Sequence, residues 1–387
     1  MPLARASAAE HVVVVGAGAF GGWTALALRR AGLRVTLVDA WGAGNARASS
    51  GGETRVIRAV YNGQAAYSAM AARALVLWRD AERAWGRRVL HRTGALWLCA
   101  SDDAYVRRSI EPMRAVGLSV EELSPGEAAR RWPQMAFGDA RTVFHEPAAG
   151  FLAARVACEL VRETFVREGG AYRQGWARPG AATHGRLPNV TLGDGGTLAA
   201  DRFVFACGPW MGQVFPDVVG RRIVATRQES FFFGTPAGDA RYDAGALPVW
   251  VHLGERLIYG VASHDRRGLK IADDTAGDEI DPTTMERAPS ADGLARARAA
   301  LAARFPALAG APLVESRVCQ YEASSDGHFL ADRHPELENV WLLGGGSGHG
   351  FKMGPALGEH AAALVRGRAS AHPLFAYARL RERPAAR

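Results

Sequence analysis

HVVVVGAGAFGGWTALALRRAGLRVTLVD, residues 11–39, is the stretch that decides the fold. It begins with four valines, residues 12–15, whose β-branched apolar side chains are typical of a strand buried on both faces. Three glycines follow in the pattern G-x-G-x-x-G: Gly16, Gly18 and Gly21. Apolar residues at helical spacing come next, and a second apolar strand ends on Asp39. Strand, glycines, helix, strand and acid in this order predict a dinucleotide-binding βαβ unit.

Each part of this unit has a mechanical role in holding a dinucleotide. Gly16 makes the tight turn, Gly18 lets a pyrophosphate approach the backbone, and Gly21 lets the helix pack closely on the strand. The N–H groups at the start of the helix then face the phosphates. Asp39 stands about 20 residues beyond the glycines, where an acid binds the ribose hydroxyls and repels a 2′-phosphate. The unit therefore favours FAD or NAD over NADP.

Composition indicates an ordinary globular protein with more than one domain. The 387 residues are many for a single hydrophobic core, and 48% of them are hydrophobic and 22% charged. A transmembrane helix over residues 12–28 is disfavoured, because the run is short and interrupted by glycines. The formal charge of +8 comes from arginines spread along the chain, without a basic run between aromatic residues, so neither nucleic acid nor membrane is an expected partner.

Cysteine and lysine usage adds two expectations. The cysteines show no C-x-x-C spacing, which predicts free thiols, no metal site and a reducing, cytoplasmic compartment. The polar lead MPLARASAAE, residues 1–10, lacks the apolar segment of a secretion signal. Lysine occurs only as Lys270 and Lys352 in an arginine-rich chain. Lysine is a compact cation whose pKa shifts when it is buried, so these two positions are either functional or a chance of composition.

The segment after the βαβ unit, ARASSGGETRVIRAVY, residues 46–61, contains turn-forming serines and glycines that can run along a cofactor. On a helical turn, Arg55 and Arg58 would share one face, because they are three residues apart. That face either binds a carboxylate in bidentate fashion or is a solvated surface, and the residues leave both open.

The rest of the chain predicts a second domain and a second glycine loop. Strands rich in aromatic and β-branched residues over 226–233 and 249–261 predict an antiparallel sheet roofing a pocket. A strand over residues 339–343 precedes the glycine-rich turn GGGSGHGFK, residues 344–352. This second strand–glycine–helix unit implies that both ends of the chain meet at one cofactor. Helices are predicted over residues 67–85, 102–116, 153–167 and 355–366.

Over nearly its full length the chain resembles the FAD-dependent amine oxidases typified by monomeric sarcosine oxidase and N-methyltryptophan oxidase. The resemblance rests on the order and spacing of GAGAFG, SSGGETRVIR, ACGPW, GLK followed by EIDP, VCQY, DGHFLADRHPE and GSGHGFK. It implies an α/β fold in which a Rossmann-like FAD-binding domain is interleaved with an α+β substrate domain built on a mostly antiparallel sheet. The implied limits are residues 1–90, 147–222 and 316–387 for the FAD-binding domain, and 91–146 and 223–315 for the substrate-binding domain.

The resemblance also implies roles along the cofactor. In the family, the cysteine matching Cys319 carries FAD through a thioether to the flavin 8α-methyl group, and the arginine matching Arg55 lies against the flavin. The lysine matching Lys270 lies near flavin N5 and promotes the reaction with O2. The other positions expected along the cofactor are Gly16, Gly18, Phe20, Gly21, Asp39, Ser50, Val56, Gly208, Trp210, Gly346, Gly348, His349, Gly350, Phe351 and Lys352.

On the substrate side, residues matching Arg58 and Lys352 hold the substrate carboxylate in the family, and the pocket is lined at Tyr259 and Tyr321. Two positions depart from the family pattern. Gly51 stands where histidine is frequent, which is expected to open space near the flavin. Asp274 occupies the position of the family's active-site histidine. A carboxylate there either attracts a cationic amine or faces solvent, which puts sarcosine itself in doubt.

The implied activity is oxidation of a small secondary amine or amino acid that carries a carboxylate. A hydride passes from the carbon next to nitrogen to flavin N5, the imine hydrolyses, and O2 reoxidises the flavin with release of H2O2. A monomer is expected. The alternatives are oxidation of a cyclic amino or imino acid in a biosynthetic pathway, a NAD-dependent dehydrogenase, and a non-catalytic flavin-binding protein. A NAD-dependent dehydrogenase would explain neither the terminal glycine loop nor Cys319.

Overall fold

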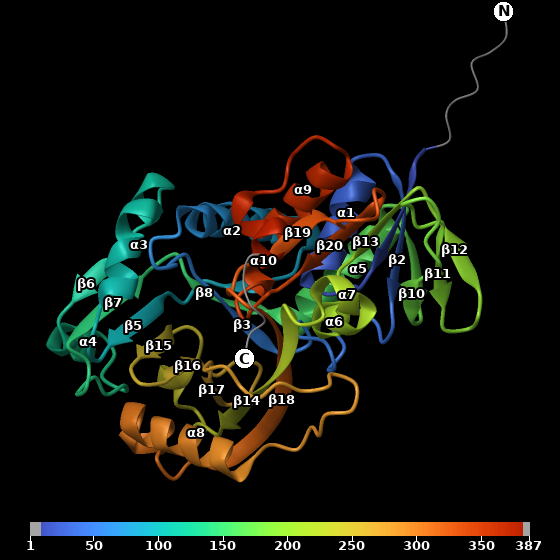
Figure 1. Ribbon diagram of the computed structural model, residues 1–387. Helices are drawn as coiled ribbons and strands as arrows, with labels where there is room; N and C mark the ends of the chain where they lie inside the picture. Colours follow the sequence, from blue (N-terminus) through green and yellow to red (C-terminus); the bar gives the residue numbers. More distant parts are fainter. Residues whose placement is uncertain (1–8, 382–387) are drawn as a thin grey trace, which may run out of the picture. The chain divides into compact units, whose positions relative to one another are not determined.

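The computed structural model describes residues 9–381, so most of the polar lead at residues 1–10 lies outside the described part of the chain. The chain divides into two compact units that alternate along the sequence (Figure 1). The first unit contains the described residues up to 51, residues 155–225 and the described residues from 321 onward. The second unit contains residues 52–154 and 226–320. The predicted interleaving is therefore present in the chain.

The first unit is built on a six-stranded sheet in the order β19-β20-β13-β1-β2-β9. Its central strand β1 is the run of valines, and it pairs in parallel with β2 and β13. Every residue of β1 is buried, as expected for a parallel strand covered on both faces. Only β19 runs antiparallel, against β20. The strands are β1 (His11–Val15), β2 (Arg34–Asp39), β9 (Ala171–Gln174), β13 (Arg202–Phe205), β19 (Leu330–Arg333) and β20 (Val340–Gly344).

Two helices that begin at glycine-rich turns lie side by side in this unit (Figure 1). They are α1 (Ala19–Arg30) and α9 (Gly354–Val365). The remaining helices of four or more residues are α5 (Ala154–Arg167), which starts at the unit boundary, α6 (Met211–Val214), α7 (Pro216–Val219) and α10 (Ala378–Arg381). A small antiparallel sheet is formed by β10 (Ala177–Pro179), β11 (Asn189–Leu192) and β12 (Thr197–Ala199).

The second unit is built on an eight-stranded sheet in the order β18-β14-β17-β16-β15-β5-β7-β6. Pairing is antiparallel between β14, β17, β16 and β15, whereas β15 and β5 are parallel. The long strands β14 (Ile223–Phe233) and β18 (Leu313–Ser324) continue past the unit boundaries. The other strands are β5 (Ala95–Cys99), β6 (Glu121–Leu123), β7 (Thr142–Glu146), β15 (Val249–Leu253), β16 (Leu257–Val261) and β17 (Leu269–Asp273).

Helices and a small sheet complete the second unit. Buried residues of α8 (Ala291–Arg304) share one hydrophobic cluster with Trp250, Phe231 and Phe305. The small sheet joins β3 (Thr54–Ile57), β8 (Gly150–Ala153) and β4 (Leu90–His91). The other helices are α2 (Ala65–Trp85), α3 (Ala104–Ala115) and α4 (Pro125–Arg131), the last of which begins with a capping box.

The compact units differ from the predicted domain limits at residues 52–90 and 147–154, which lie in the second unit because β3 and β4 both pair with β8. One local expectation is wrong. Arg55 stands on strand β3 rather than on a helical turn, so its spacing to Arg58 does not place the two on one helix face. Which unit holds the cofactor and which the substrate stays a prediction.

No helix within residues 9–381 is long and apolar enough to cross a membrane. All four cysteines are free thiols: Cys99, Cys158, Cys207 and Cys319. The uncharged run at residues 12–28 is a buried strand followed by the first turns of α1.

Candidate active site

The first glycine motif forms a close turn between β1 and α1. Gly16 has φ +106°, and a Cβ at that position would lie 2.1 Å from the carbonyl oxygen of Ala206. A Cβ at Gly21 would lie 1.8 Å from the carbonyl oxygen of Gly16. No side chain caps α1 at Gly18, so its first N–H groups are available to a phosphate apart from that of Ala19, which donates to Ser50 Oγ at 3.0 Å.

Asp39 closes this motif at the end of β2. Its carboxylate accepts a hydrogen bond from the N–H of Ala17 at 2.7 Å, and from those of Trp41 and Gly42 at 3.0 and 2.8 Å. The bond to Ala17 ties the acid to the glycine turn. Burial nevertheless raises the pKa of Asp39, while the three N–H groups act in the opposite direction.

Close to the motif, Trp210 packs against Trp41 with ring centroids 4.7 Å apart. Trp210 ends a single 3₁₀ turn that begins at Gly208, where φ is +56°. The predicted cofactor positions Asp39, Gly208 and Trp210 are thus brought near one another at the carboxyl ends of β2 and β13, where open α/β sheets bind ligands.

The terminal glycine loop, residues 344–352, meets the first motif through aromatic side chains. Phe20 on α1 lies 5.4 Å from Phe329 between ring centroids, and Phe329 stacks on His349 at 4.8 Å. Gly348 has φ +77°, and a Cβ there would lie 2.7 Å from the ring of Tyr321. Residues from the two ends of the described chain therefore form one site in the first unit.

Lys352 is the last residue of this loop and is 3% exposed. Its Nζ donates to the carbonyl oxygen of His349 at 2.8 Å. The imidazole of His349 is itself held by the carbonyl oxygen of Gly327 at 2.9 Å. Lys352 is thus a buried cation anchored within the glycine loop by the backbone of His349.

Gly51 does not open space as expected. A Cβ at this position would lie 1.7 Å from the carbonyl oxygen of Asn45 and 2.7 Å from its carbonyl carbon. Glycine therefore stands here because the backbone of residues 45 and 51 approaches closely, and a larger side chain would collide with it.

In the second unit, β3, β17 and β18 bring together three of the predicted residues. Arg55 donates from Nη2 to Cys319 Sγ at 3.3 Å and from Nη1 to the carbonyl oxygen of Thr54 at 2.8 Å. The same carbonyl oxygen accepts from Lys270 Nζ at 3.4 Å. Lys270 also lies over the ring of Tyr259, with Nζ 5.2 Å from the centroid.

Lys270 is 4% exposed. Burial and the guanidinium of Arg55 lower the pKa of Lys270 to about 7, against opposing effects of Cys319 and Asp274. The side chain can therefore change charge near neutral pH. Val56 and Tyr259 both pack against a small hydrophobic cluster of the second unit.

Arg58 has different surroundings in the same unit. Its guanidinium lies 4.4 Å from the ring centroid of Tyr61 and 5.3 Å from that of Trp97, and it donates to the carbonyl oxygen of Val60. Burial alone would lower the pKa of Arg58, but nearby Tyr105 and other groups raise it overall. Within residues 9–381, no carboxylate forms an ion pair with Arg58. Most of its five donors thus remain available to an anion.

Asp274 follows directly after β17, where its N–H donates to the carbonyl oxygen of Leu257 at 2.7 Å. Its carboxylate is near enough to act on the pKa of both Arg58 and Lys270. The role of Asp274, attraction of a cationic amine or exposure to solvent, stays a prediction.

Two buried acids are not predicted by any sequence motif. Glu146 at the end of β7 accepts from the N–H of Ala59 at 2.5 Å and from Trp97 Nε1 at 3.3 Å, and so fixes the backbone and one ring beside Arg58. In the first unit, burial raises the pKa of Glu322 to about 8, and no described residue is a hydrogen-bond partner of its Oε1. Neither acid belongs to a motif; only their apolar flanking residues could have signalled burial.

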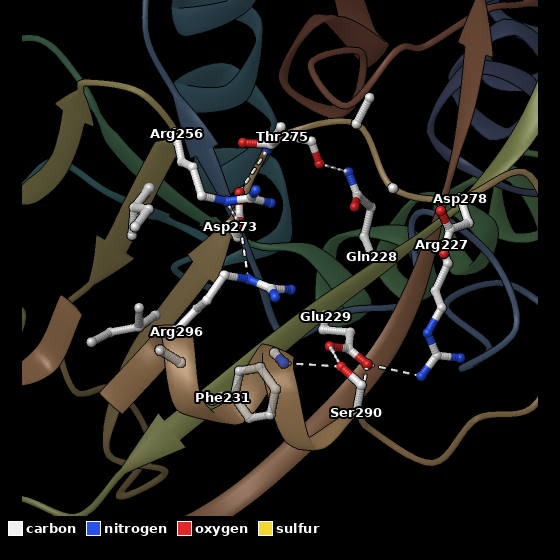
Figure 2. A pocket seen from close by; sticks show the side chains of 16 residues that line it. Arg227, Gln228, Glu229, Phe231, Arg256, Asp273, Thr275, Asp278, Ser290 and Arg296 are labelled. Carbon is white, nitrogen blue, oxygen red and sulfur yellow. Dashed lines mark hydrogen bonds and ion pairs between the residues drawn. The ribbon is translucent and has the colours of Figure 1, made fainter. Parts of the chain in front are cut away.

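A cavity of about 180 Å³ in the second unit is a different site (Figure 2). It is lined by Ile271 and Asp273 of β17, which point to the face opposite Lys270 because side chains alternate along a strand. Its arginines are already paired: Arg256 and Arg296 with Asp273, and Arg227 with Glu229 (Figure 2). The cavity therefore does not belong to the cluster around Lys270.

The two glycine turns fit a dinucleotide cofactor. The tight turn at Gly16, the uncapped start of α1 and the carboxylate of Asp39 provide for the pyrophosphate and ribose of FAD. Beside a flavin, a lysine whose pKa lies near neutrality and a thiol next to an arginine can take part in chemistry.

Comparisons with known proteins agree with this reading. Residues 11–364 match the family described as FAD dependent oxidoreductase. The monomeric sarcosine oxidase of Bacillus sp. (strain B-0618) is 28% identical over 360 residues, covering 90% of each chain. The N-methyl-L-tryptophan oxidase of Yersinia pestis (strain Pestoides F) is 24% identical over 375 residues, covering 96% of this chain and 99% of its own.

Among solved structures, the L-proline dehydrogenase of P. horikoshii superposes with a TM-score of 0.83 at 20% identity, covering 96% of this chain and 98% of its own. The fructosyl amine:oxygen oxidoreductase (Amadoriase I) of Aspergillus fumigatus gives 0.82 at 21% identity, covering 97% and 91%. At these identities the two structures establish the fold, and they confirm the predicted fold class.

Proposed function

The chain belongs to the FAD dependent oxidoreductase family and is an FAD-dependent oxidoreductase, and we propose that it oxidises a secondary amine carrying a carboxylate, with O2 as the final electron acceptor. The observation that carries the proposal is Arg58, a guanidinium close to two aromatic rings with no carboxylate partner among the described residues. The relatives named for sarcosine and N-methyl-L-tryptophan, both N-methyl amino acids, support the same substrate class.

When bound, the flavin supplies the redox chemistry, taking a hydride from the carbon next to the amine nitrogen and passing the electrons to O2 with formation of H2O2. The residues of this chain bind and orient. Arg58 and Lys352 hold the carboxylate, and the rings of Tyr259 and Tyr321 line the pocket. Asp274 attracts the amine nitrogen. Lys270 supplies positive charge where O2 gains electrons.

The proposal extends to the compartment and the oligomeric state of the protein. Four free thiols support a reducing, cytoplasmic compartment. We infer a monomer by analogy with the relative named monomeric sarcosine oxidase.

A screen for released H2O2 tests the function. The panel comprises N-methyl amino acids, cyclic amino acids and the matched amines that lack the carboxylate. We expect peroxide from at least one acid and a far slower reaction with its decarboxylated partner. Equal rates for the pair would contradict the role of Arg58. Reduction of an artificial dye without peroxide would replace the oxidase with a dehydrogenase. A preference for cyclic acids would favour the biosynthetic alternative.

A second prediction concerns attachment of FAD to Cys319. The contact between Cys319 Sγ and Arg55 Nη2 at 3.3 Å places the thiol beside the arginine that is expected to lie against the flavin. Acid-precipitated wild-type protein should stay yellow, and Cys319→Ser should lose its flavin to the supernatant. The matched control is Cys158→Ser, which changes a buried thiol of the first unit and should keep its flavin. Flavin retained by denatured Cys319→Ser would rule out this attachment.

A further inference from the structure

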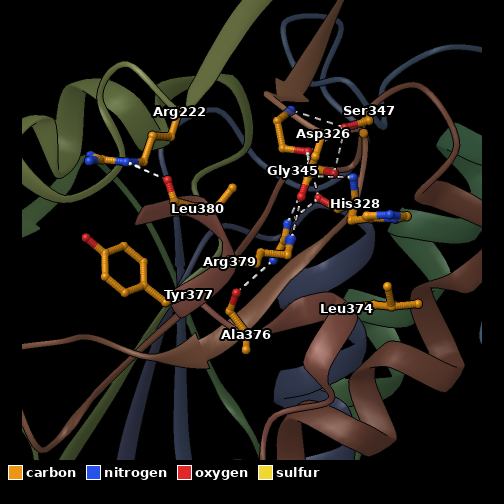
Figure 3. A network of polar contacts seen from close by, with 12 residues as sticks. Arg222, Asp326, His328, Gly345, Ser347, Leu374, Ala376, Tyr377, Arg379 and Leu380 are labelled. Carbon is orange, nitrogen blue, oxygen red and sulfur yellow. Dashed lines mark hydrogen bonds and ion pairs between the residues drawn. The ribbon is translucent and has the colours of Figure 1, made fainter. Parts of the chain in front are cut away.

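Arg379, near the end of the described chain, forms a largely buried ion pair with Asp326 that has no part in the proposed activity. Its Nε donates to Asp326 Oδ2 at 2.9 Å, and its Nη2 to Asp326 Oδ1 at 3.4 Å (Figure 3). The two side chains are 13% and 2% exposed. The guanidinium also donates to the carbonyl oxygens of His328 at 2.8 Å and Ala376 at 3.0 Å. Four donated hydrogen bonds fix it in one orientation.

The segment that carries Arg379 is itself tied to the first unit. The N–H of Tyr377 donates to Asp332 Oδ2 on β19 at 2.8 Å. Arg222 Nε donates to the carbonyl oxygen of Leu380 at 2.9 Å (Figure 3). The backbone on either side of Arg379 is therefore hydrogen-bonded to the first unit.

Asp326 organises the turn between β18 and β19, residues 324–328. Its Oδ1 accepts from the N–H of His328 at 3.1 Å and from Ser324 Oγ at 3.3 Å. The hydroxyl of Ser324 lies 2.7 Å from the carbonyl oxygen of His328. Both ends of the turn are thus bonded to the carboxylate that Arg379 holds.

The turn at residues 324–328 is hydrogen-bonded to the glycine loop, residues 344–352. The N–H of Ser324 donates to Ser347 Oγ at 3.2 Å, and the carbonyl oxygen of Gly327 bonds His349 Nε2 at 2.9 Å. Ser347 has φ +44°, a conformation that a residue with a side chain adopts only when its surroundings impose it. The carbonyl oxygen of His349 then accepts from Lys352 Nζ at 2.8 Å.

We propose that Arg379 is a positioning residue that, through Asp326 and the turn at residues 324–328, holds the glycine loop in the shape that places Lys352. The inference rests on the proposed function for the role of Lys352 toward substrate. Its structural part, control of the loop by Arg379, does not depend on that function. Removing one partner of a buried ion pair also destabilises a protein, so stability alone cannot test the proposal.

Amide hydrogen exchange of the purified full-length protein tests the structural part. The variants are Arg379→Ala, Arg379→Lys and Asp326→Asn, and the matched control is Arg381→Ala, an exposed arginine of the same short helix. Exchange should quicken in peptides covering residues 322–328 and 344–352 in Arg379→Ala, less in Arg379→Lys, and not in Arg381→Ala. An unchanged 344–352 peptide, or equal acceleration throughout the protein, would overturn the proposal.

Steady-state kinetics with the best carboxylate substrate test the consequence for Lys352. A displaced lysine should raise KM about 10- to 100-fold in Arg379→Ala, with a smaller loss in kcat and partial recovery in Arg379→Lys. A lower melting temperature with KM unchanged would reduce Arg379 to a structural residue. If the wild-type protein oxidises no amine, the proposed function fails, and the exchange experiment decides the positioning role by itself.

Discussion

Lys270 and Arg58 are both buried cations of the second unit, but their neighbours differ. Lys270 lies beside a second cation, Arg55, and burial with this neighbour lowers its pKa to about 7. Arg58 lies close to the rings of Tyr61 and Trp97, whose faces attract a cation without neutralising it. The first arrangement suits a group that changes charge during a reaction, and the second suits a permanent charge that awaits an anion.

Loss of Arg58 should act mainly on substrate binding. Arg58→Ala should raise KM for an acidic substrate by an amount equivalent to about 2–5 kcal/mol, since the partner carboxylate would lose a buried, charge-assisted contact. The KM of Arg58→Lys should lie between those of the wild type and Arg58→Ala, because the point charge of lysine replaces only part of the planar guanidinium fork. Arg107→Ala, which removes an exposed arginine paired with Asp103 and Glu122, is the control. An unchanged KM in Arg58→Ala would refute the carboxylate assignment.

Lys270 should matter for the reaction with O2 more than for oxidation of the amine. Lys270→Met should slow flavin reoxidation about 100-fold or more, while anaerobic reduction falls much less. In the wild type, reoxidation should slow as pH rises through the pKa of Lys270, because the ammonium is charged below it and neutral above it. The inflection in the reoxidation rate should lie at pH 7 or above, since a negative charge near Lys270 raises the pKa of its ammonium group.

Stopped-flow measurement of both half-reactions against pH checks this prediction, and Lys270→Met should lack the inflection. Equal losses in the two half-reactions would make Lys270 a residue that positions substrate. Normal reoxidation in the variant would remove it from the oxygen reaction altogether.

At the scale of elements, the packing of α1 on α9 joins the two glycine turns of the first unit (Figure 1). A Cβ at Gly358 would lie 2.8 Å from the backbone carbon and from Cβ of Trp23. A Cβ at Gly354 would lie 2.7 Å from the Trp23 ring. Gly354 and Gly358 of α9 thus let Trp23 of α1 approach the α9 backbone. This close contact fixes how the two helices pack against each other.

Gly358→Ala should therefore destabilise the first unit. The added methyl group cannot fit without a shift, which should cost about 1–3 kcal/mol and outweigh the roughly 1 kcal/mol that alanine contributes to a helix. Thermal denaturation measures the difference. The control is Gly126→Ala in α4, where the nearest atom to a new Cβ is Arg130 Nη1 at 3.8 Å, so its melting temperature should stay or rise. A Gly358→Ala variant as stable as the wild type would contradict close packing here.

Long elements were predictable from the sequence because their signals are local. The run of valines, the helix over 67–85 and the antiparallel strands over 249–261 occur as expected in β1, α2 and the β15–β16 pair. Arg55 was placed on the wrong element, because a four-residue strand such as β3 is specified by its partner β8, about 95 residues away. Gly51 was misread for the same reason, since its neighbour Asn45 is a tertiary contact.

Candidate site residues that belong to a sequence motif were predictable, whereas those distinguished only by their burial were not. Cys319, Arg55 and Lys270 belong to motifs, and the structure brings all three together. Glu146 and Glu322 lie in no motif. The local sequence around an acid does not show whether its side chain is buried or exposed. Their roles depend on which strands neighbour them, and strand order is not written in local spacing.

At the scale of the whole molecule, the chain passes between its two units at residues 51–52, 154–155, 225–226 and 320–321. The first unit carries the glycine turns, Asp39 and Lys352, and the second carries Arg55, Arg58, Lys270 and Cys319. The predicted roles divide in the same way, with the dinucleotide features in one unit and most of the catalytic residues in the other.

Anaerobic mixing of the purified flavoprotein with N-methyl or cyclic amino acids tests the central claim most directly. The oxidised flavin absorbance should bleach with at least one of these acids and return when air is admitted, with one H2O2 formed for each flavin reoxidised. The matched amine without a carboxylate should bleach the flavin far more slowly. A flavin that none of these acids bleaches, or that bleaches equally fast with the amine lacking a carboxylate, would contradict an oxidase that selects its substrate through Arg58.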